Sequence, residues 1–511
     1  MDVLVLFASQ TGNAERVAQA VWQQLQGFAV ESALLSMGEA DVETIRGARD
    51  VLLVVSTCGE GDMPDSARAL WQALATQAPD LQGVHFALLA LGDCLYDDFC
   101  GAGKRWDARL AALGAVRLRE RVDCDVEYEA DAQAWTQAVL AQLADRRGWS
   151  RRVAIPVVRE EMPPGYSRED PLAVRLLERQ VLTGAGALRE VVHVELDVCR
   201  EVTWTPGDIV YIWPENPAEL VAQIIAALDA RGADQVSWQG RRERLDTLLA
   251  RHLEVSTPSP ALQAALGLTA QAGADVLECL RARPVLDAQD AVELLKPLSP
   301  RAYSIANVQG ADHRMALTVG HVQYERHGRW HYGAASHFLA TAPMGTTMRA
   351  FLAANRYFSV PADGSDMIMI ATGTGIAPFR GFLQERAQRN ARGRNWLFFG
   401  ERQKSCDFLY GNELQLWQEN GVLDRLDLAF SRDQHEKVYV QHLLRAQGAA
   451  LFAWLEAGAF LFVCGSKAPM AEEVDGVLHE VVAEHGNMPA ANAAAYIARL
   501  KNDKRYVRDV Y

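Results

Sequence analysis

In two parts of this 511-residue chain, a short apolar segment is followed directly by a loop of small residues and then by a helical pattern. The first covers residues 3–26 and the second covers residues 367–380. An apolar segment without polar alternation predicts a parallel strand that is buried on both faces. Backbone N–H groups at the start of the following helix can hold a phosphate. The chain is therefore expected to contain two α/β sheets with nucleotide-binding loops.

Residues 1–145 repeat this alternation of strand and helix five times. The expected strands cover residues 3–7, 30–35, 51–55, 86–91 and 116–122. Amphipathic segments, which predict helices, lie between them. Five units of this kind predict an open, doubly wound parallel sheet, and such a sheet binds its ligands at the carboxyl ends of its strands.

Three of those strand ends carry loops rich in small and polar residues. The first loop lacks the lysine of a triphosphate-binding loop, which favours a phosphate monoester. Tyr96, in the third loop, is expected to stack on a flat ring that the loops enclose. An ordinary turn is an alternative for each loop alone, but three successive loops indicate one site. The loop residues expected to bind this ligand are Ser9, Gln10, Thr11, Gly12, Asn13, Ala14, Ser56, Thr57, Cys58, Gly59, Leu91, Gly92, Asp93, Cys94, Leu95, Tyr96, Asp97, Asp98, Phe99 and Cys100.

The pattern changes after this sheet. Residues 146–170 contain Pro-Pro-Gly and predict a linker, and alternating apolar residues at 192–198 predict a half-buried antiparallel strand. A further strand at 209–213 indicates a β-barrel. Residues 217–296 are rich in Ala and Leu and predict helices. They are expected to interrupt the barrel, whose strands resume at residue 301.

Arg301, Ala302, Tyr303 and Ser304 open the resumed barrel. In a strand, Arg301 and Tyr303 share a face. The arginine can pair with a diphosphate, the tyrosine can lie against an isoalloxazine ring, and Ser304 can reach the reactive N5 edge of that ring. A surface strand is the alternative for the tetrapeptide taken alone. The phosphate-type loops on either side of it favour an FAD site.

From residue 361 the chain returns to an α/β pattern. Gly373-Thr374-Gly375 stands between an expected strand and an expected helix, which is the context of a nucleotide-binding loop. Ser431, Arg432 and Lys437 follow a later strand and supply one hydroxyl and two cations. That set suits the 2′-phosphate that distinguishes NADPH from NADH. A solvated basic turn is the alternative.

These motifs resemble the diflavin reductase family over nearly the whole chain. Ser-Gln-Thr-Gly-Asn at 9–13, Ser-Thr-Cys-Gly-Glu-Gly at 56–61 and Leu-Gly-Asp-x-x-Tyr at 91–96 are similar to the FMN loops of that family. Cys58 stands where the cytochrome P450 reductase branch has a second stacking tyrosine. Residues 505–511 are similar to the terminus of the sulfite reductase flavoprotein. The resemblance is therefore closest to the NADPH-dependent sulfite reductase flavoprotein subunit.

The resemblance implies sites for FMN, FAD and NADPH, and no metal. It assigns Ser304, Cys464 and Asp509 to the path of the hydride. His337 departs from the family, which has a small residue after Ser336; a plain helix N-cap at Ser336 is the alternative for this loop. The FAD residues it implies are Arg301, Ala302, Tyr303, Ser304, Thr318, Val319, Gly320, Tyr324, Gly333, Ala334, Ala335, Ser336 and Tyr511. The NADPH residues it implies are Thr374, Ser431, Arg432, Lys437, Val438, Tyr439, Val440, Gln441 and Glu473.

The resemblance also implies an organisation and an electron path. It implies a flavodoxin-like FMN domain at 1–145, a linker at 146–170, an FAD-binding barrel at 171–360 with a helical insertion at about 217–296, and an NADPH-binding domain at 361–511. Electrons would pass from NADPH to FAD, to FMN and then to a haem- or sirohaem-containing acceptor protein. Two alternatives stay open: a general NADPH–haemoprotein reductase of the cytochrome P450 type, and a flavin-binding regulatory or interaction protein.

Charge is distributed unevenly along the chain. Residues 1–145 contain 10 Lys and Arg against 22 Asp and Glu, a net charge of −12 out of −14 for the whole chain. An acidic domain disfavours nucleic acid and suits a partner with a basic docking face, with solubility alone as the alternative.

The apolar segments are too short to span a membrane. The eight cysteines include no C-x-x-C pair, which predicts reduced thiols in a cytoplasmic protein. The oligomeric state stays open.

Overall fold

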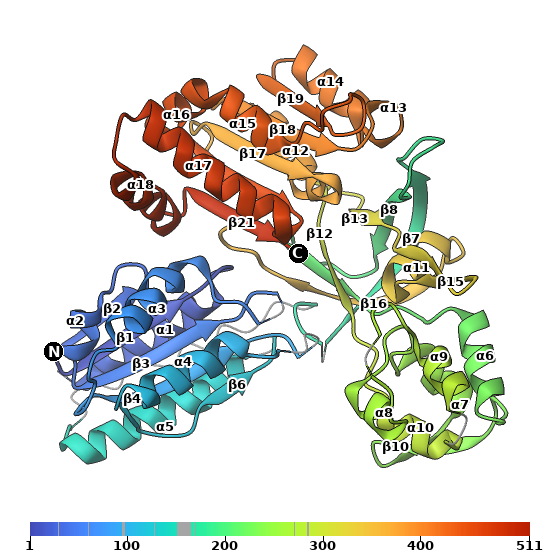
Figure 1. The fold of residues 1–511 in the computed structure, drawn as a ribbon, viewed down its shortest axis with the longest axis horizontal. Helices are drawn as coiled ribbons and strands as arrows, with labels where there is room; N and C mark the ends of the chain where they lie inside the picture. The colour runs from blue at the N-terminus through green and yellow to red at the C-terminus, as the bar shows by residue number, and fades with distance from the viewer. Residues whose placement is uncertain are drawn as a thin grey trace.

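The computed structural model describes residues 1–28, 30–59, 61–94, 98–126, 128–150, 165–168, 170–269, 271–283 and 286–511. Figure 1 shows three parts: an N-terminal sheet domain, a central barrel with a helical lobe, and a C-terminal sheet domain. The C-terminus of the chain lies where the three parts meet. Among the described residues, no helix is both long and apolar enough to cross a membrane.

The N-terminal part is a parallel sheet with helices on both faces. Its strand order is β2-β1-β3-β4-β5, and β6 also pairs with β4. Leu4 and Leu6 pack on one face and Val3 and Val5 on the other, because side chains alternate along a strand. This order is flavodoxin-like, which confirms the predicted doubly wound sheet. The elements are β1 (Val3–Ala8), β2 (Ser32–Ser36), β3 (Asp50–Ser56), β4 (His85–Leu91), β5 (Val116–Arg117), β6 (Val122–Cys124), α1 (Asn13–Leu25), α2 (Val42–Arg46), α3 (Asp65–Gln77), α4 (Gly101–Ala112) and α5 (Glu129–Arg147).

The single strand predicted at residues 116–122 is wrong, because this segment forms the two short strands β5 and β6. Arg117 and Arg121 both pair with Asp107 of α4, at nitrogen–oxygen distances of 2.8 and 3.4 Å. These ion pairs hold the intervening residues against α4. The segment therefore pairs with β4 only at its two ends.

The central part is an antiparallel barrel, as predicted. Its strand order is β12-β9-β16-β7-β8-β13. A bridge between Ile305 and Leu317 joins the two ends of this order, and the inward side chains form one buried core. The strands are β7 (Leu172–Val181), β8 (Val191–Val198), β9 (Ile209–Ile212), β12 (Arg301–Ser304), β13 (Arg314–Gly320) and β16 (Thr347–Ala353). The hairpin β14 (Gln323–Arg326) and β15 (Arg329–Tyr332) and the helix α11 (Ala334–Thr341) lie between β13 and β16.

The insertion between β9 and β12 forms a lobe with its own apolar core. It contains the helices α6 (Ala218–Ala227), α7 (Leu245–Arg251), α8 (Pro260–Ala265), α9 (Val276–Ala282) and α10 (Ala288–Leu294). The purely helical prediction is wrong at β10 (Gln235–Trp238) and β11 (Arg241–Arg244), which form a hairpin. Gln239 and Gly240, with φ values of 47° and 76°, form its turn. Two successive residues with positive φ are typical of tight hairpin turns, and they end any helix.

The C-terminal part is a second parallel sheet with the order β19-β18-β17-β20-β21. Helices cover both of its faces (Figure 1). The strands are β17 (Met367–Thr372), β18 (Asn395–Glu401), β19 (Arg425–Phe430), β20 (Phe460–Gly465) and β21 (Tyr506–Val510). The helices are α12 (Ile376–Arg389), α13 (Lys404–Asp407), α14 (Gly411–Glu419), α15 (Val440–Ala446), α16 (Gly448–Glu456), α17 (Glu472–His485) and α18 (Ala490–Asn502), and the short turns η2 (Gly373–Gly375) and η3 (Lys467–Ala471) precede α12 and α17.

The two sheet domains contact each other through the first loop of the N-terminal sheet and the last strand of the chain. Gln10 Nε2 donates a hydrogen bond to the carbonyl oxygen of Arg508, at 3.1 Å. Lys504 Nζ lies 4.4 Å from the centre of the Tyr357 ring. A methyl group at Gly12 would lie 3.4 Å from the same ring. The carboxyl ends of the N-terminal strands therefore face the rest of the molecule rather than open solvent.

Candidate functional site

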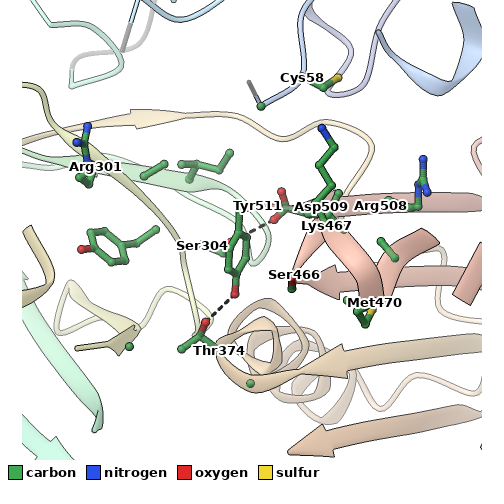
Figure 2. Close-up of a pocket in the computed structure, with 18 of the residues that line it drawn as sticks. Cys58, Arg301, Ser304, Thr374, Ser466, Lys467, Met470, Arg508, Asp509 and Tyr511 are labelled. Atoms are coloured by element: carbon green, nitrogen blue, oxygen red, sulfur yellow. Dashed lines mark hydrogen bonds between the residues drawn. The ribbon is translucent and has the colours of Figure 1, made fainter. Parts of the chain in front are cut away.

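A cavity of about 1440 Å³ lies where the three parts meet. Its walls come from the strand ends of both sheets, from β12 and β13 of the barrel, and from the start of α11. Figure 2 shows residues of all three parts around it, with Arg301 at one end and Arg508 at the other. The three predicted cofactor sites therefore belong to one continuous space.

The loop after β1 is shaped by Ser9. The buried hydroxyl of Ser9 accepts hydrogen bonds from the N–H groups of Gly12 and Ala14, at 3.0 and 3.2 Å. Gly12 has a φ of 96°, which glycine adopts without strain. Gln10, Thr11 and Asn13 line the cavity. Ser9, Gly12 and Ala14 therefore support the loop, and their neighbours are its exposed binding groups.

The loop after β3 reaches the same cavity. Ser56, Thr57, Cys58 and Gly59 line the cavity. The buried Oγ1 of Thr57 has no hydrogen-bond partner within the described residues. A buried polar atom aimed at a cavity fits a ligand that completes its hydrogen bond. Burial raises the pKa of Cys58 to about 12, so this thiol is neutral at physiological pH.

The loop after β4 is described only at its two ends. Leu91, Gly92, Asp93, Asp98, Phe99 and Cys100 line the cavity. Leu95, Tyr96 and Asp97, including the predicted stacking tyrosine, lie outside the described residues. The thiol of Cys94 is exposed and donates a hydrogen bond to Asp125. Arg168, near the end of the predicted linker, pairs with Asp125 at 2.8 Å and thereby attaches this loop to the start of the barrel.

Arg301, Ala302, Tyr303 and Ser304 all line the cavity from β12. The guanidinium of Arg301 is 46% exposed and lies 3.6 Å from the buried carboxylate of Glu254. An exposed guanidinium at a cavity wall fits a diphosphate, and Glu254 orients it. Glu254 comes from the helical insertion, and no sequence signal pointed to it.

The expected FAD residues beyond β12 divide into two groups. Thr318, Gly320, Tyr324, Gly333, Ala334, Ala335 and Ser336 line the cavity, whereas Val319 packs into the barrel core. The alternative of a helix N-cap at Ser336 is wrong, because Gly333 occupies that position and Ser336 lies in the first turn. Ser336 Oγ instead accepts a hydrogen bond from the N–H of Val322, at 3.1 Å. This bond ties the loop to the segment that follows β13.

The residues assigned to the hydride path lie near the end of β21 (Figure 2). Ser304 Oγ donates a hydrogen bond to Asp509 Oδ2, at 3.1 Å. The pKa of Asp509 is raised to about 6 by burial, although the hydrogen bond from Ser304 acts in the opposite direction. Cys464 pairs with Asp509 across β20 and β21, and its buried side chain lies outside the cavity lining. Burial and the nearby Asp509 raise the pKa of the Cys464 thiol.

Tyr511 closes this corner of the cavity. Its hydroxyl lies 2.7 Å from Thr374 Oγ1, and its side chain is 61% exposed. Figure 2 shows its ring between Asp509 and Thr374. An exposed aromatic ring held by one hydrogen bond can be displaced at low cost. Tyr511 can therefore give way to another flat ring.

Most of the NADPH residues predicted beyond Thr374 belong to the part of the cavity wall that the C-terminal sheet domain forms. Ser431, Arg432, Tyr439, Val440, Gln441 and Glu473 line it, but Lys437 and Val438 are not among its described lining. Lys437 is exposed to solvent. Two further arginines, Arg189 and Arg402, do line the cavity. Arg402 follows β18 as Arg432 follows β19, so its position could have been predicted; Arg189 comes from the barrel and carries no such signal.

Two ion pairs between the sheet domains were not predicted. Lys467 pairs with Asp62, and Arg508 pairs with Asp65. Lys467 is the first residue of η3, and Figure 2 shows it extended toward the loop that contains Cys58. The Arg508–Asp65 pair is nearly buried, with 9% and 13% of the two side chains exposed. Strand β21 thus contacts the N-terminal loops through Arg508 and the barrel through the adjacent Asp509.

The three parts of the chain match three protein-family models in order. Residues 5–135 match flavodoxin, residues 164–283 match an FAD binding domain and residues 369–476 match an oxidoreductase NAD-binding domain. These modules, arranged around one cavity, define a diflavin oxidoreductase that uses FMN, FAD and NADPH.

Curated relatives narrow this class to one family. The sulfite reductase [NADPH] flavoprotein alpha-component of Vibrio cholerae is 39% identical over 534 residues, which cover 99% of this chain and 87% of that protein. Those of Shigella dysenteriae and Escherichia coli K12 are 39% identical over 536 residues, which cover 100% of this chain and 90% of each relative. The chain belongs to the family of sulfite reductase [NADPH] flavoprotein alpha-components.

Proposed function

We propose that this diflavin reductase passes electrons from NADPH through FAD and FMN to the haemoprotein component of a sulfite reductase. The observation that carries the proposal is the single cavity, in which strand ends of both sheets and β12 of the barrel face one another. Bound flavins supply the redox chemistry, taking up a hydride and releasing single electrons. The residues of the chain bind, orient and shield these groups.

We place the flavins and the coenzyme at three sets of residues. The loops after β1, β3 and β4 are proposed to hold FMN, with Thr57 Oγ1 completing a hydrogen bond to it. Arg301, Tyr303 and the loop 333–336 are proposed to hold FAD. Arg432 and Ser431 are proposed to bind the 2′-phosphate of NADPH, and Tyr439 and Gln441 lie beside it in the same wall. The proposed domain limits are 1–145, 171–360 and 361–511, with 146–170 as the linker.

Ser304 and Asp509 are proposed to act at the point of hydride transfer. Their hydrogen bond holds the carboxylate at the edge of the cavity. An ionised Asp509 can stabilise the positive charge that develops on a nicotinamide ring as its hydride leaves. Cys464 is proposed to act indirectly, through the position of Asp509. It pairs with Asp509 on the neighbouring strand and is not among the described residues that line the cavity.

The acceptor is proposed to dock on the acidic rim of the FMN loops. Asp62, Asp65 and Asp98 are the described carboxylates of that rim; Glu60 and Asp97 lie outside the described residues. In this arrangement Asp62 and Asp65 pair with Lys467 and Arg508. A basic acceptor face competes with these two cations for the same carboxylates.

The proposal can be tested with purified components. The full chain is mixed with NADPH, sulfite and the haemoprotein component of a homologous sulfite reductase, and sulfide is measured. Cytochrome c serves as a small artificial acceptor. Sulfide formation with both proteins present supports the proposal. Rapid cytochrome c reduction without sulfide formation assigns another haemoprotein as acceptor, whereas failure with both acceptors contradicts a reductase function and leaves a flavin-binding interaction protein.

A further inference from the structure

Two histidines lie side by side next to the proposed FAD diphosphate loop. His321 directly follows β13, and His337 lies in the first turn of α11. His321 Nε2 is 3.0 Å from His337 Nδ1, and His321 Nδ1 is 2.9 Å from Glu190 Oε1. The side chain of His321 is 6% exposed, whereas that of Glu190 is 40% exposed. A carboxylate and two imidazoles are thus connected by hydrogen bonds.

These hydrogen bonds allow two protonation states. An ionised Glu190 only accepts, so His321 carries a proton on Nδ1. Without a further proton, His321 Nε2 accepts and His337 donates from Nδ1. When one proton is added at His337 Nε2, the proton on His337 Nδ1 moves to His321 Nε2. His321 then donates from both nitrogens, and the net charge of the pair rises by one. The proton enters at the half-buried His337, but the charge resides on His321.

His321 belongs to the wall of the cavity at the proposed diphosphate site. It lines the same cavity as Gly333 and Ser336. The next residue, Val322, receives a hydrogen bond at its carbonyl from the N–H of Gly333, at 3.0 Å, and donates its own N–H to Ser336 Oγ. A charge on His321 is therefore held close to the loop that would bind a diphosphate.

We propose that His321 stabilises bound FAD through its charge while its two ring nitrogens stay bonded to Glu190 and His337, and that His337 controls this charge and so makes FAD affinity depend on pH. This inference rests on the proposed placement of the FAD diphosphate at residues 333–336. A diphosphate is held more strongly close to an imidazolium than close to a neutral imidazole, because opposite charges attract. No such role follows from the family motifs, in which a small residue stands at the position of His337.

The direction of the pH dependence follows from the groups that face the pair. Glu190, which precedes β8, favours the protonated pair, and Tyr332 of β15 lies with its ring centre 4.1 Å from that of His337. Burial and the neighbouring His321 lower the pKa of His337. A bound diphosphate acts in the opposite direction, because it stabilises the added charge. FAD affinity is therefore highest at acidic pH and falls as the pair loses its proton.

The test is a titration of FAD into the FAD-depleted full-length chain between pH 5.5 and 8.5, followed by flavin fluorescence. The dissociation constant of the wild type is expected to rise roughly five- to tenfold over this range, since one charge–charge contact is lost. His337→Asn retains a donor near the position of Nδ1 but cannot take up the proton. It is expected to show a flat profile at the high-pH affinity of the wild type.

His327→Asn is the matched control. His327 is exposed at the tip of the β14–β15 hairpin, and its φ of 50° is one that asparagine tolerates. This variant is expected to keep the full pH dependence. Glu190→Gln serves as a second variant if His337→Asn folds poorly, and it should move the transition to lower pH. The ¹⁵N signals of His321 and His337 should titrate together, at a higher pH with FAD bound.

The outcomes separate this inference from the placement on which it rests. If Arg301→Ala leaves FAD affinity unchanged at every pH, the proposed placement of FAD is wrong. If Arg301→Ala weakens FAD while the wild type and His337→Asn share the same pH profile, the placement stands and the role of the histidine pair is overturned. Independent titration of the two histidines also overturns it.

Discussion

At the scale of the residue, burial and a hydrogen bond have opposite effects on the pKa of Asp509 in the proposed hydride site. Burial raises its pKa to about 6, while the hydrogen bond from Ser304 favours the ionised form. The carboxylate is therefore charged above about pH 6 and neutral below it. Only the charged form stabilises a positive charge that develops on the nicotinamide.

We therefore expect flavin reduction by NADPH in the wild type to slow as the pH falls through about 6. Asp509→Asn should be slower by at least about tenfold at pH 7.5, because a preorganised charge is lost, and its rate should not change near pH 6. Stopped-flow absorbance from pH 5 to 8 measures both. A step near pH 6 that persists in Asp509→Asn assigns the titration to another group.

Arg432 and Lys437 differ in their surroundings although they lie close in the sequence. Arg432 lines the cavity and Lys437 does not. Arg432→Ala should raise the KM for NADPH by roughly ten- to a hundredfold, because a charge-assisted bond to a phosphate contributes about 1.5–3 kcal/mol. It should leave NADH almost unaffected. Lys437→Ala is the comparison and should change either KM less than about threefold. Steady-state kinetics with both coenzymes would contradict the assignment if the two variants behaved alike.

At the scale of the element, the loop between β1 and α1 and the segment at the end of β21 each present side chains to the cavity. The loop presents Gln10, Thr11 and Asn13 around a glycine with positive φ. Tyr511 directly follows β21, and its side-chain hydroxyl forms a hydrogen bond with Thr374 at the cavity. Each element can therefore be altered without rebuilding its sheet.

Thr11→Glu should expel FMN and leave FAD bound, since its carboxylate would face the phosphate of FMN. Released flavins can be separated by chromatography and quantified per chain. About one FAD and almost no FMN are expected, and Thr11→Ser should retain both. Loss of both flavins from Thr11→Glu would contradict two independent sites.

Tyr511→Ala should weaken the preference for NADPH over NADH. The substitution removes a ring that nicotinamide would otherwise displace, and such a stacked ring contributes about 1 kcal/mol. The kcat with NADH should rise about fivefold, and NADP⁺ should dissociate more slowly. Tyr511→Phe loses only the hydrogen bond to Thr374 and should resemble the wild type. An unchanged coenzyme preference and flavin spectrum in Tyr511→Ala would place the ring away from the flavin.

At the scale of the whole molecule, the same carboxylates serve two contacts. The N-terminal domain carries a net charge of −12, and in the described arrangement Asp62 and Asp65 are engaged by the C-terminal domain. This arrangement brings the proposed FMN and FAD sites into one cavity. The proposed acceptor needs the same rim. We therefore propose that these ion pairs separate when the acceptor docks.

Lys467→Glu should shift the balance between these two contacts. The pair with Asp62 is partly exposed, so its loss corresponds to about 0.2–1 kcal/mol, or up to about fivefold. Electron transfer between the flavins should slow by that factor. The double variant Asp62→Lys with Lys467→Glu restores an ion pair and should recover the transfer rate. Stopped-flow spectra of flavin oxidation states measure this step, and no recovery in the double variant would exclude a direct pairing effect.

Salt should act on the acceptor step more than on hydride transfer. Raising the ionic strength from about 50 to about 300 mM shortens the Debye length and weakens attraction between exposed charges. Acceptor reduction should slow steeply, whereas flavin reduction by NADPH should slow much less. Asp98→Lys should reproduce the effect on the acceptor step alone. Acceptor reduction that is insensitive to both changes would place docking elsewhere, for example on the helical lobe.

The sequence by itself determined the features that depend on local pattern. Continuous apolar segments and the loops after them predicted both parallel sheets, because a strand buried on two faces has no polar positions. The alternation at 192–198 predicted the barrel, and most of the loops that line the cavity followed from their place at strand ends. Ser304 and Asp509 were assigned from motifs that resemble a known family, and the structure brings them within 3.1 Å.

Other features were decided only by tertiary structure, because they depend on contacts between different elements of the fold. Arg117 and Arg121 divide a predicted strand through Asp107, and Lys437 is exposed outside the described lining of a cavity that Arg189 reaches from the barrel. The pairing of Lys467 with Asp62 joins residues about 400 positions apart. Such contacts leave no periodic signal in the chain, since each arises where two different elements pack against each other.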